Sequence, residues 1–134
     1  GEENCLFVLE QPNALAPLRL VRIDITSWNA RVLGPVTLIG GNIRAALTID
    51  AAGDLFVAVS RPQIGLTRIA RLHVRGDHVT RAGETIHVGH WLAGGIYSDR
   101  NGLHYIGETA TRYEQTRIPM TQFQHTPFQG AWCP

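Results

Sequence analysis

The residues closest to a metal motif are two histidines three positions apart, His87 and His90. On a helix, residues with this spacing share a face, whereas on a strand they point to opposite faces. The pair falls where a strand should pass into a loop, so ordinary polar histidines are favoured over metal ligands. Nor does His104 bring a carboxylate or histidine at a recognised ligand spacing. We therefore expect no metal site and no cofactor.

The chain offers little support for a catalytic serine nucleophile or for a catalytic pair of carboxylates. Its candidate serines do not lie in a Gly-x-Ser-x-Gly context. Glu108 and Glu114 flank a predicted loop, but a glycosidase pair needs a defined separation across a cleft. A solvated loop explains these acids better, and we expect no catalytic residues.

Composition excludes several further classes. All twelve basic residues are arginine, so a Schiff-base lysine and a phosphate-loop lysine are ruled out. The formal net charge is only +1, which does not favour nucleic acid as a partner. No run of about 18 apolar residues is present, so we expect no membrane insertion.

Two cysteines, Cys5 and Cys133, lie near opposite ends of the chain. They are too distant in sequence for a metal knuckle, which favours a disulfide and a secreted or periplasmic protein. In the entropic model such a long loop would contribute about 4–5 kcal/mol. The alternative is two unrelated buried thiols.

The chain contains an internal repeat, and the strands of that repeat must position any functional site. Residues 6–25 align without a gap with residues 55–74, 49 positions later, and Arg19, Arg68 and Arg117 keep the same spacing. Such a period fixes architecture more firmly than local propensity does. We expect these arginines to occupy one structural position, where a reused salt bridge is favoured over a repeated anion site.

Each copy predicts four short strands. Apolar and polar residues alternate with a period of two, which is typical of strands. Asp50–Gly53 and Asp99–Gly102 predict tight hairpin turns, since Asp bonds the backbone and Gly accepts positive φ. The expected strands lie near residues 6–10, 18–25, 30–39, 43–49, 55–60, 67–74, 78–88, 91–98, 103–108, 116–123 and 125–132.

The segments LTIDAAGDLFVAVS and GIYSDRNGLHYIGET resemble the first hairpin of blades in NHL, TolB-like and gluconolactonase-like β-propellers. The resemblance implies an all-β, single domain over residues 1–134, built from three blades of four antiparallel strands. Blade I covers 6–39 and lacks its first strand, blade II covers 43–88, and blade III covers 91–132. The third copy aligns with one deletion after Gly102 and one insertion before Thr116.

Three blades cannot close a ring, because propellers typically have four to eight. Two chains could form a six-bladed ring, or the repeats could form an open or sandwich-like arrangement closed by the disulfide. In the dimer, the tail Gln124–Pro134 could supply the missing strand of its neighbour. Cys133 would then approach Cys5 of the other subunit.

In propellers, ligands bind where loops converge at one end of the ring, and function concentrates on loops. The charged, aromatic and titratable residues of those loops are Arg61, His90, Trp91, Glu108 and Arg112. No aromatic residue recurs between copies, so a single divergent site is expected. The isolated pair Gly94-Gly95 indicates close strand packing.

These patterns favour a non-catalytic, lectin-like binding module for a partner protein or a carbohydrate. An enzyme of the hydrolase or lactonase kind is the alternative that the propeller resemblance permits. A purely structural assembly subunit is the third possibility.

Overall fold

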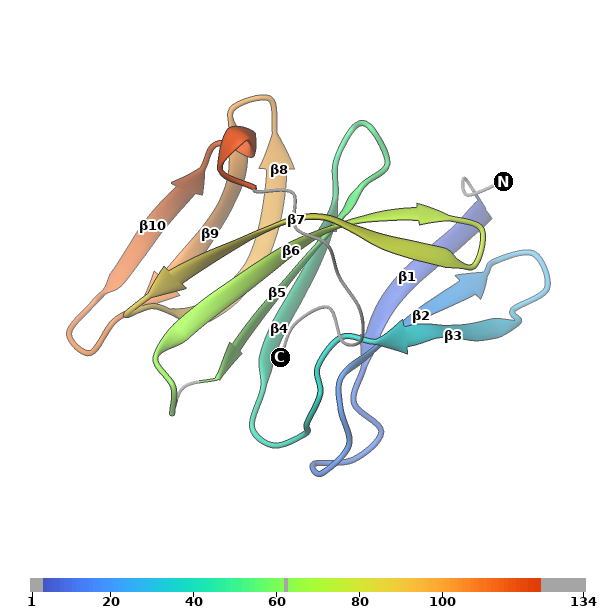
Figure 1. The fold of residues 1–134 in the computed structure, drawn as a ribbon, viewed down its shortest axis with the longest axis horizontal. Helices are drawn as coiled ribbons and strands as arrows, with labels where there is room; N and C mark the ends of the chain where they lie inside the picture. The colour runs from blue at the N-terminus through green and yellow to red at the C-terminus, as the bar shows by residue number, and fades with distance from the viewer. Residues whose placement is uncertain (1–3, 62, 124–134) are drawn as a thin grey trace.

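The chain folds into three antiparallel β-sheets that fan out side by side (Figure 1). The computed structural model describes residues 4–61 and 63–123. The predicted all-β class is confirmed: no α-helix occurs among these residues, and none of their helical segments could cross a membrane. Cys133 lies outside them, so the Cys5–Cys133 disulfide stays a prediction.

The strands follow the order of the sequence. Sheet I contains β1 (Cys5–Glu10), β2 (Arg19–Asp24) and β3 (Ala30–Pro35). Sheet II contains β4 (Arg44–Ile49), β5 (Leu55–Arg61), β6 (Leu66–Arg75) and β7 (His78–Val88). Sheet III contains β8 (Trp91–Asp99), β9 (Gly102–Glu108) and β10 (Tyr113–Ile118), followed by the 3-10 turn η2 (Met120–Gln122). Within each sheet, strands adjacent in sequence are paired.

The two predicted hairpin turns are present. The Asp50 carboxylate accepts hydrogen bonds from the backbone N–H groups of Ala52 at 3.0 Å and Asp54 at 2.9 Å. Asp99 accepts one from Asn101 at 2.7 Å. Gly102, which has a φ of 132°, also lies so near the Ile118 carbonyl that an added Cβ would come within 2.3 Å of its oxygen. The hairpins therefore depend on local side-chain bonds and on glycine.

Sheet II is buried on both faces, so every residue of β5 is buried. One face packs against sheet I and forms the first core cluster, which is centred on Leu20, Leu55 and Leu72. The other face packs against sheet III and forms the second cluster, with Phe56 and Tyr105 at its centre. Alternation along β5 thus sends Leu55 to one neighbouring sheet and Phe56 to the other.

The third copy aligns differently from the sequence prediction. Phe7 pairs with Arg22, Phe56 with Arg71, and the corresponding His104 pairs with Arg117. Arg117 is therefore the counterpart of Arg22 and Arg71, so the prediction that it shares a position with Arg19 and Arg68 is wrong.

The cause is a shorter connection between β9 and β10: 13 positions separate His104 from Arg117, whereas 15 separate Phe56 from Arg71 and Phe7 from Arg22. The expected insertion before Thr116 is a deletion, and the strand predicted at 116–123 is Tyr113–Ile118. The strand predicted at 30–39 ends at Pro35. The one predicted at 125–132 lies outside the described residues.

The strand arginines make structural contacts. Arg19 pairs with Glu10, and Arg68 pairs with Glu84 at 3.3 Å. Arg117 donates to the Asn101 carbonyl at 2.8 Å, within its own hairpin turn. These contacts join neighbouring strands or close a turn, but each arginine has a partner of a different kind or place, so the expected reuse of one contact is not found.

Gly94 and Gly95 do not mark close packing, contrary to the sequence prediction. A Cβ built on either residue would meet no atom within 4 Å. Both line a shallow cavity of about 530 Å³ between β4 and β8, together with Ala45 and Ala46. Small residues therefore border open space along the first strands of sheets II and III.

Candidate functional site

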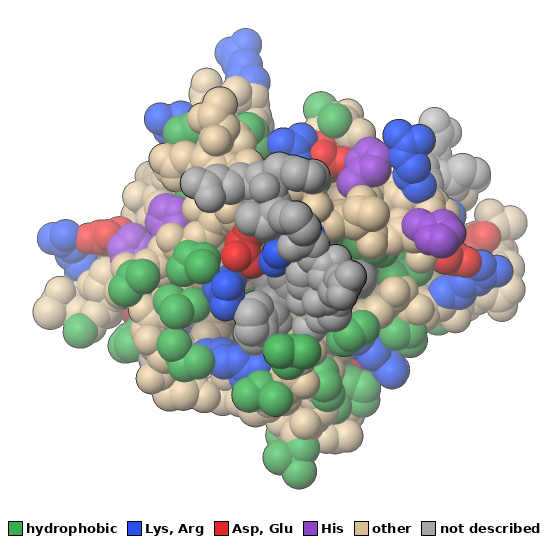
Figure 2. All heavy atoms as spheres, in the orientation of Figure 1, with side chains coloured by type: hydrophobic (Ala, Val, Ile, Leu, Met, Phe, Trp, Pro, Cys, Tyr) green, Lys and Arg blue, Asp and Glu red, His purple; other side chains and the backbone are tan. Residues whose placement is uncertain are grey.

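Four of the five predicted site residues gather at one end of sheets II and III. The turn between β7 and β8 carries His90 and Trp91, and the loop between β9 and β10 carries Arg112. Trp91 pairs directly with Glu108, which ends β9. Figure 2 shows basic, acidic and histidine side chains side by side at the left of the view, where sheet III ends. The loops that the sequence singled out thus meet in space.

His90, Glu114 and Arg112 form a chain of polar contacts. His90 Nε2 lies 3.1 Å from Glu114 Oε2, and Arg112 Nε donates to Glu114 Oε1 at 2.7 Å. The hydrogen bond from Arg112 is the main reason that the pKa of Glu114 is held below its ordinary value. Glu114 is therefore a carboxylate at neutral pH and can orient both neighbours.

The His90 ring is held in place by its surroundings. It lies over Gly107, where an added Cβ would come within 3.0 Å of Nδ1. The His90 carbonyl accepts a hydrogen bond from the Thr67 hydroxyl of sheet II at 3.0 Å. No described residue bonds to Nδ1, which is buried. Gly107 thus provides the space in which the imidazole packs.

Arg44 joins the first strand of sheet II to this end of sheet III. Its Nη1 lies 3.2 Å from Glu108 Oε1 and 3.3 Å from the Leu92 carbonyl. Trp91 is half-buried beside Gly65, and its Nε1 has no hydrogen-bond partner among the described residues. Arg44 therefore connects β4 to the neighbouring ends of β8 and β9.

The rings of His87 and Tyr105 lie next to His90 in this site. Their rings meet edge to face with centroids 6.0 Å apart, and His90 lies 6.3 Å from His87. Burial, and secondarily the charge of His90, lowers the pKa of His87. Burial raises the pKa of Tyr105 to about 12. Both side chains are thus neutral at physiological pH.

The Tyr105 hydroxyl is buried and has no hydrogen-bond partner among the described residues. Thr116 lies near enough to lower the tyrosine pKa slightly, but its side chain does not reach hydrogen-bonding geometry. An unpaired buried hydroxyl costs about 1–3 kcal/mol. We therefore expect Tyr105→Phe to raise the free energy of unfolding by about 1 kcal/mol, measured by urea denaturation. Tyr113→Phe, at an exposed position, should change it by less than about 0.5 kcal/mol. A loss of stability in Tyr105→Phe would mean that an ordered water completes the hydroxyl.

Arg61, the fifth predicted residue, is placed elsewhere. It is buried between sheets I and II, where its guanidinium donates to the carbonyls of Ile39 and Gly40, each at 2.6 Å. Two strong bonds to backbone explain this arginine as a clamp on the segment that leads into β4.

Sequence reasoning missed Arg44 and Tyr105. Arg44 is the first residue of a strand and Tyr105 lies inside one, whereas the predicted site residues were chosen from the predicted loops. The period-two pattern of β9 could have indicated that Tyr105 points between sheets, because Leu103 shares its parity.

Within residues 4–61 and 63–123, no three His, Cys, Asp or Glu side chains stand where they could share a metal ion. The chain matches no family model, no curated protein and no solved structure. The geometry of this site is thus the guide to function. It offers aromatic rings beside a paired guanidinium and carboxylate.

Proposed function

We propose that this protein is a secreted or periplasmic binding module of the β-propeller type, whose ring is closed by two copies. A partner protein binds the loop end formed by His90, Trp91, Glu108 and Arg112. The observation that carries the proposal is that the two outer sheet faces repeat the faces packed together inside the chain.

Every internal interface follows one rule. The face of sheet II that contains Leu55 and Val57 packs against sheet I. The corresponding face of sheet III, with Leu103 and Tyr105, packs against sheet II. Each sheet therefore presents the same face to the sheet before it, and the opposite face to the sheet that follows.

Sheet I has no sheet before it, and yet its corresponding face is apolar. By the 49-residue period, Leu6 and Val8 are the counterparts of Leu55 and Val57. Leu6 is 48% exposed and Val32, on the same face, is 54% exposed. This face has the composition of a buried interface, although no described sheet covers it.

No sheet follows sheet III among the described residues, and its outer face carries large apolar side chains as well. Tyr97 is 53% exposed and stacks on His104 with ring centroids 4.7 Å apart. Ile106 and Tyr113 lie on the same face and are exposed. This face corresponds to the Phe56 face of sheet II, which is buried by its neighbour.

The two outer faces are thus the two halves of one repeated interface. Sheet III of one copy would pack against sheet I of a second copy, and the same contact made twice closes the assembly. Three blades from each copy give six, within the range of known propellers. Apolar faces of this kind mark protein interaction sites.

Protein recognition at the loop end is favoured by the residue types found there. Trp, Tyr and Arg dominate the binding energy of protein interfaces. Arg112 is 71% exposed at this end, where Trp91 is half-buried. An exposed guanidinium and an aromatic ring are therefore available at the same loop end.

Solution mass tests the ring. We expect multi-angle light scattering to give twice the 14.8 kDa mass of one chain. Val32→Arg and Ile106→Arg each place a charge in the proposed contact and should give monomers. Val88→Arg, at an apolar residue that is more exposed and lies outside both faces, should remain dimeric. A monomeric wild type would refute the ring.

Differential capture tests the loop end. We expect a specific extracellular protein, identified by mass spectrometry, to bind immobilised wild type and to be at least tenfold depleted with Arg112→Ala. Arg31→Ala is the matched control, because Arg31 is similarly exposed and also paired, but lies at the opposite end beside Asp77. Equal loss in both variants would contradict the site, and binding only to a glycan array would favour a carbohydrate.

A further inference from the structure

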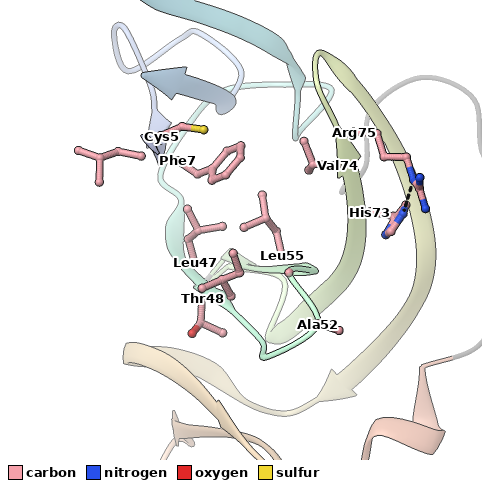
Figure 3. A pocket seen from close by; sticks show the side chains of 12 residues that line it. Cys5, Phe7, Leu47, Thr48, Ala52, Leu55, His73, Val74 and Arg75 are labelled. Atoms are coloured by element: carbon pink, nitrogen blue, oxygen red, sulfur yellow. Dashed lines mark hydrogen bonds between the residues drawn. The ribbon is translucent and has the colours of Figure 1, made fainter. Parts of the chain in front are cut away.

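A groove runs along the edge of β1 that faces away from β2. Among the described residues, β1 pairs with β2 alone. Beside its other edge lies a cavity of about 580 Å³ between sheets I and II. Figure 3 shows Phe7 on one side of this cavity and Leu47, Leu55 and Val74 around the rest of it.

The repeat explains what this groove lacks. In sheet II, β4 pairs with β5 along its whole length, from Arg44 opposite Ser60 to Ile49 opposite Leu55. β4 also lies against β8, where Ser98 Oγ donates to the Ile49 carbonyl at 3.1 Å. Within the part of the chain that the structure describes, sheet I has no counterpart of β4. A strand paired with β1 would occupy the groove in the same way.

We propose that the groove is a strand-acceptor site, and that it takes residues Gln129–Pro134 of a second copy, antiparallel to β1. This inference rests on the two-copy ring proposed above. Main-chain hydrogen bonds to an exposed edge provide affinity in such sites, and alternate side-chain positions provide specificity.

The sequence of this segment fits the position. The first strands of sheets II and III each contain two small residues before a large apolar one, Ala45-Ala46-Leu47 and Gly94-Gly95-Ile96. Gly130-Ala131-Trp132 repeats that pattern. In this register Ala131 is the counterpart of Ala46, whose face meets the following sheet, so its small side chain would enter the cavity.

The path of the chain favours a second copy as the donor. The last strand of sheet I leads into β4, and the last strand of sheet II leads into β8. In both cases the chain therefore passes from the last strand of one sheet to the first strand of the next. Beyond sheet III, the next sheet in the proposed ring is sheet I of the other copy.

Hydrogen exchange tests this site in the full-length protein. We expect the β1 amides that point away from β2 to exchange at least tenfold more slowly than unpaired edge amides. Ala131→Arg and Ile49→Arg should remove that protection, because both place a charge in the cavity; Ile49 lines it and is half-exposed. Gln129→Arg is the control, since its counterpart Arg44 is already an arginine.

The outcomes separate this site from the ring. Unprotected β1 amides in a dimeric wild type would overturn the acceptor site and leave the ring standing. Protection that persists in a monomeric Ile106→Arg variant would show that the chain's own tail fills the groove, which overturns the second copy as donor. Protection lost in both cavity variants and in the Ile106→Arg monomer, but kept in Gln129→Arg, supports the proposal.

Discussion

Phe56→Ala should lower the free energy of unfolding by about 3–5 kcal/mol, the range found when buried aromatics are truncated. Phe56 is fully buried in the middle sheet, in the cluster that joins sheets II and III. Its ring meets Phe123 edge to face at 5.1 Å, and the Arg71 guanidinium lies over it at 5.5 Å. Truncation would leave a cavity that paired strands on both sides cannot collapse to fill.

Urea denaturation followed by tryptophan fluorescence measures this effect. Leu15→Ala removes a large apolar side chain from an exposed loop position, so it should cost less than about 0.5 kcal/mol. A loss below about 1 kcal/mol in Phe56→Ala would mean that sheets II and III do not share this core.

The hairpins and the strand order could be predicted because their causes are local. Asp50 and Gly53 lie within one turn, and the turn needs little beyond an Asx bond and a positive φ. Period-two alternation likewise predicted the strand β6, and a short apolar run predicted β5. Strand limits near 43–49 and 78–88 consequently agree with the structure.

The third copy could not be aligned from sequence, because Arg117 matches a strand arginine of the second copy in either of two registers. The 49-residue spacing favoured Arg117 as the counterpart of Arg68. The shorter loop before Tyr113 moves Arg117 to the position of Arg71 instead. Loop length alters the register without leaving a mark on the strand pattern.

The candidate site was predictable where it lies on loops. His90 and Trp91 follow one strand and Glu108 ends another, and neighbouring sheets bring these positions together. Arg61 shares the same loop end by sequence, but its bonds to Ile39 and Gly40 draw it between sheets I and II. Such carbonyl contacts involve residues more than twenty positions away, which no local pattern reveals.

Asp54→Asn should lower the free energy of unfolding by about 2 kcal/mol at pH 7, because it removes the charge that two partly exposed donors share, and hydrogen bonds to charged groups contribute about 1.5–3 kcal/mol. Asp54 is buried at the start of β5. Its Oδ2 accepts from Arg71 Nε at 2.8 Å, and its Oδ1 lies 2.7 Å from His73 Nδ1. His73 Nε2 in turn accepts from Arg75 at 2.9 Å. One carboxylate therefore fixes three side chains of β6.

The same variant should flatten the acid limb of the stability curve. Burial alone would raise the pKa of Asp54, but hydrogen bonds from His73 and Arg71 outweigh it and hold the pKa below its ordinary value. A carboxylate with a depressed folded-state pKa stabilises the fold above its unfolded pKa, near 4, and loses that effect as pH falls through the folded value. Urea midpoints between pH 7 and pH 2.5 should therefore fall less steeply in Asp54→Asn than in wild type.

Asp77→Asn is the control, because the Asp77 carboxylate pairs with Arg31 at the surface. This variant should keep the wild-type slope and lose less than about 0.5 kcal/mol. Parallel curves for wild type and Asp54→Asn would mean that this carboxylate does not couple folding to protons.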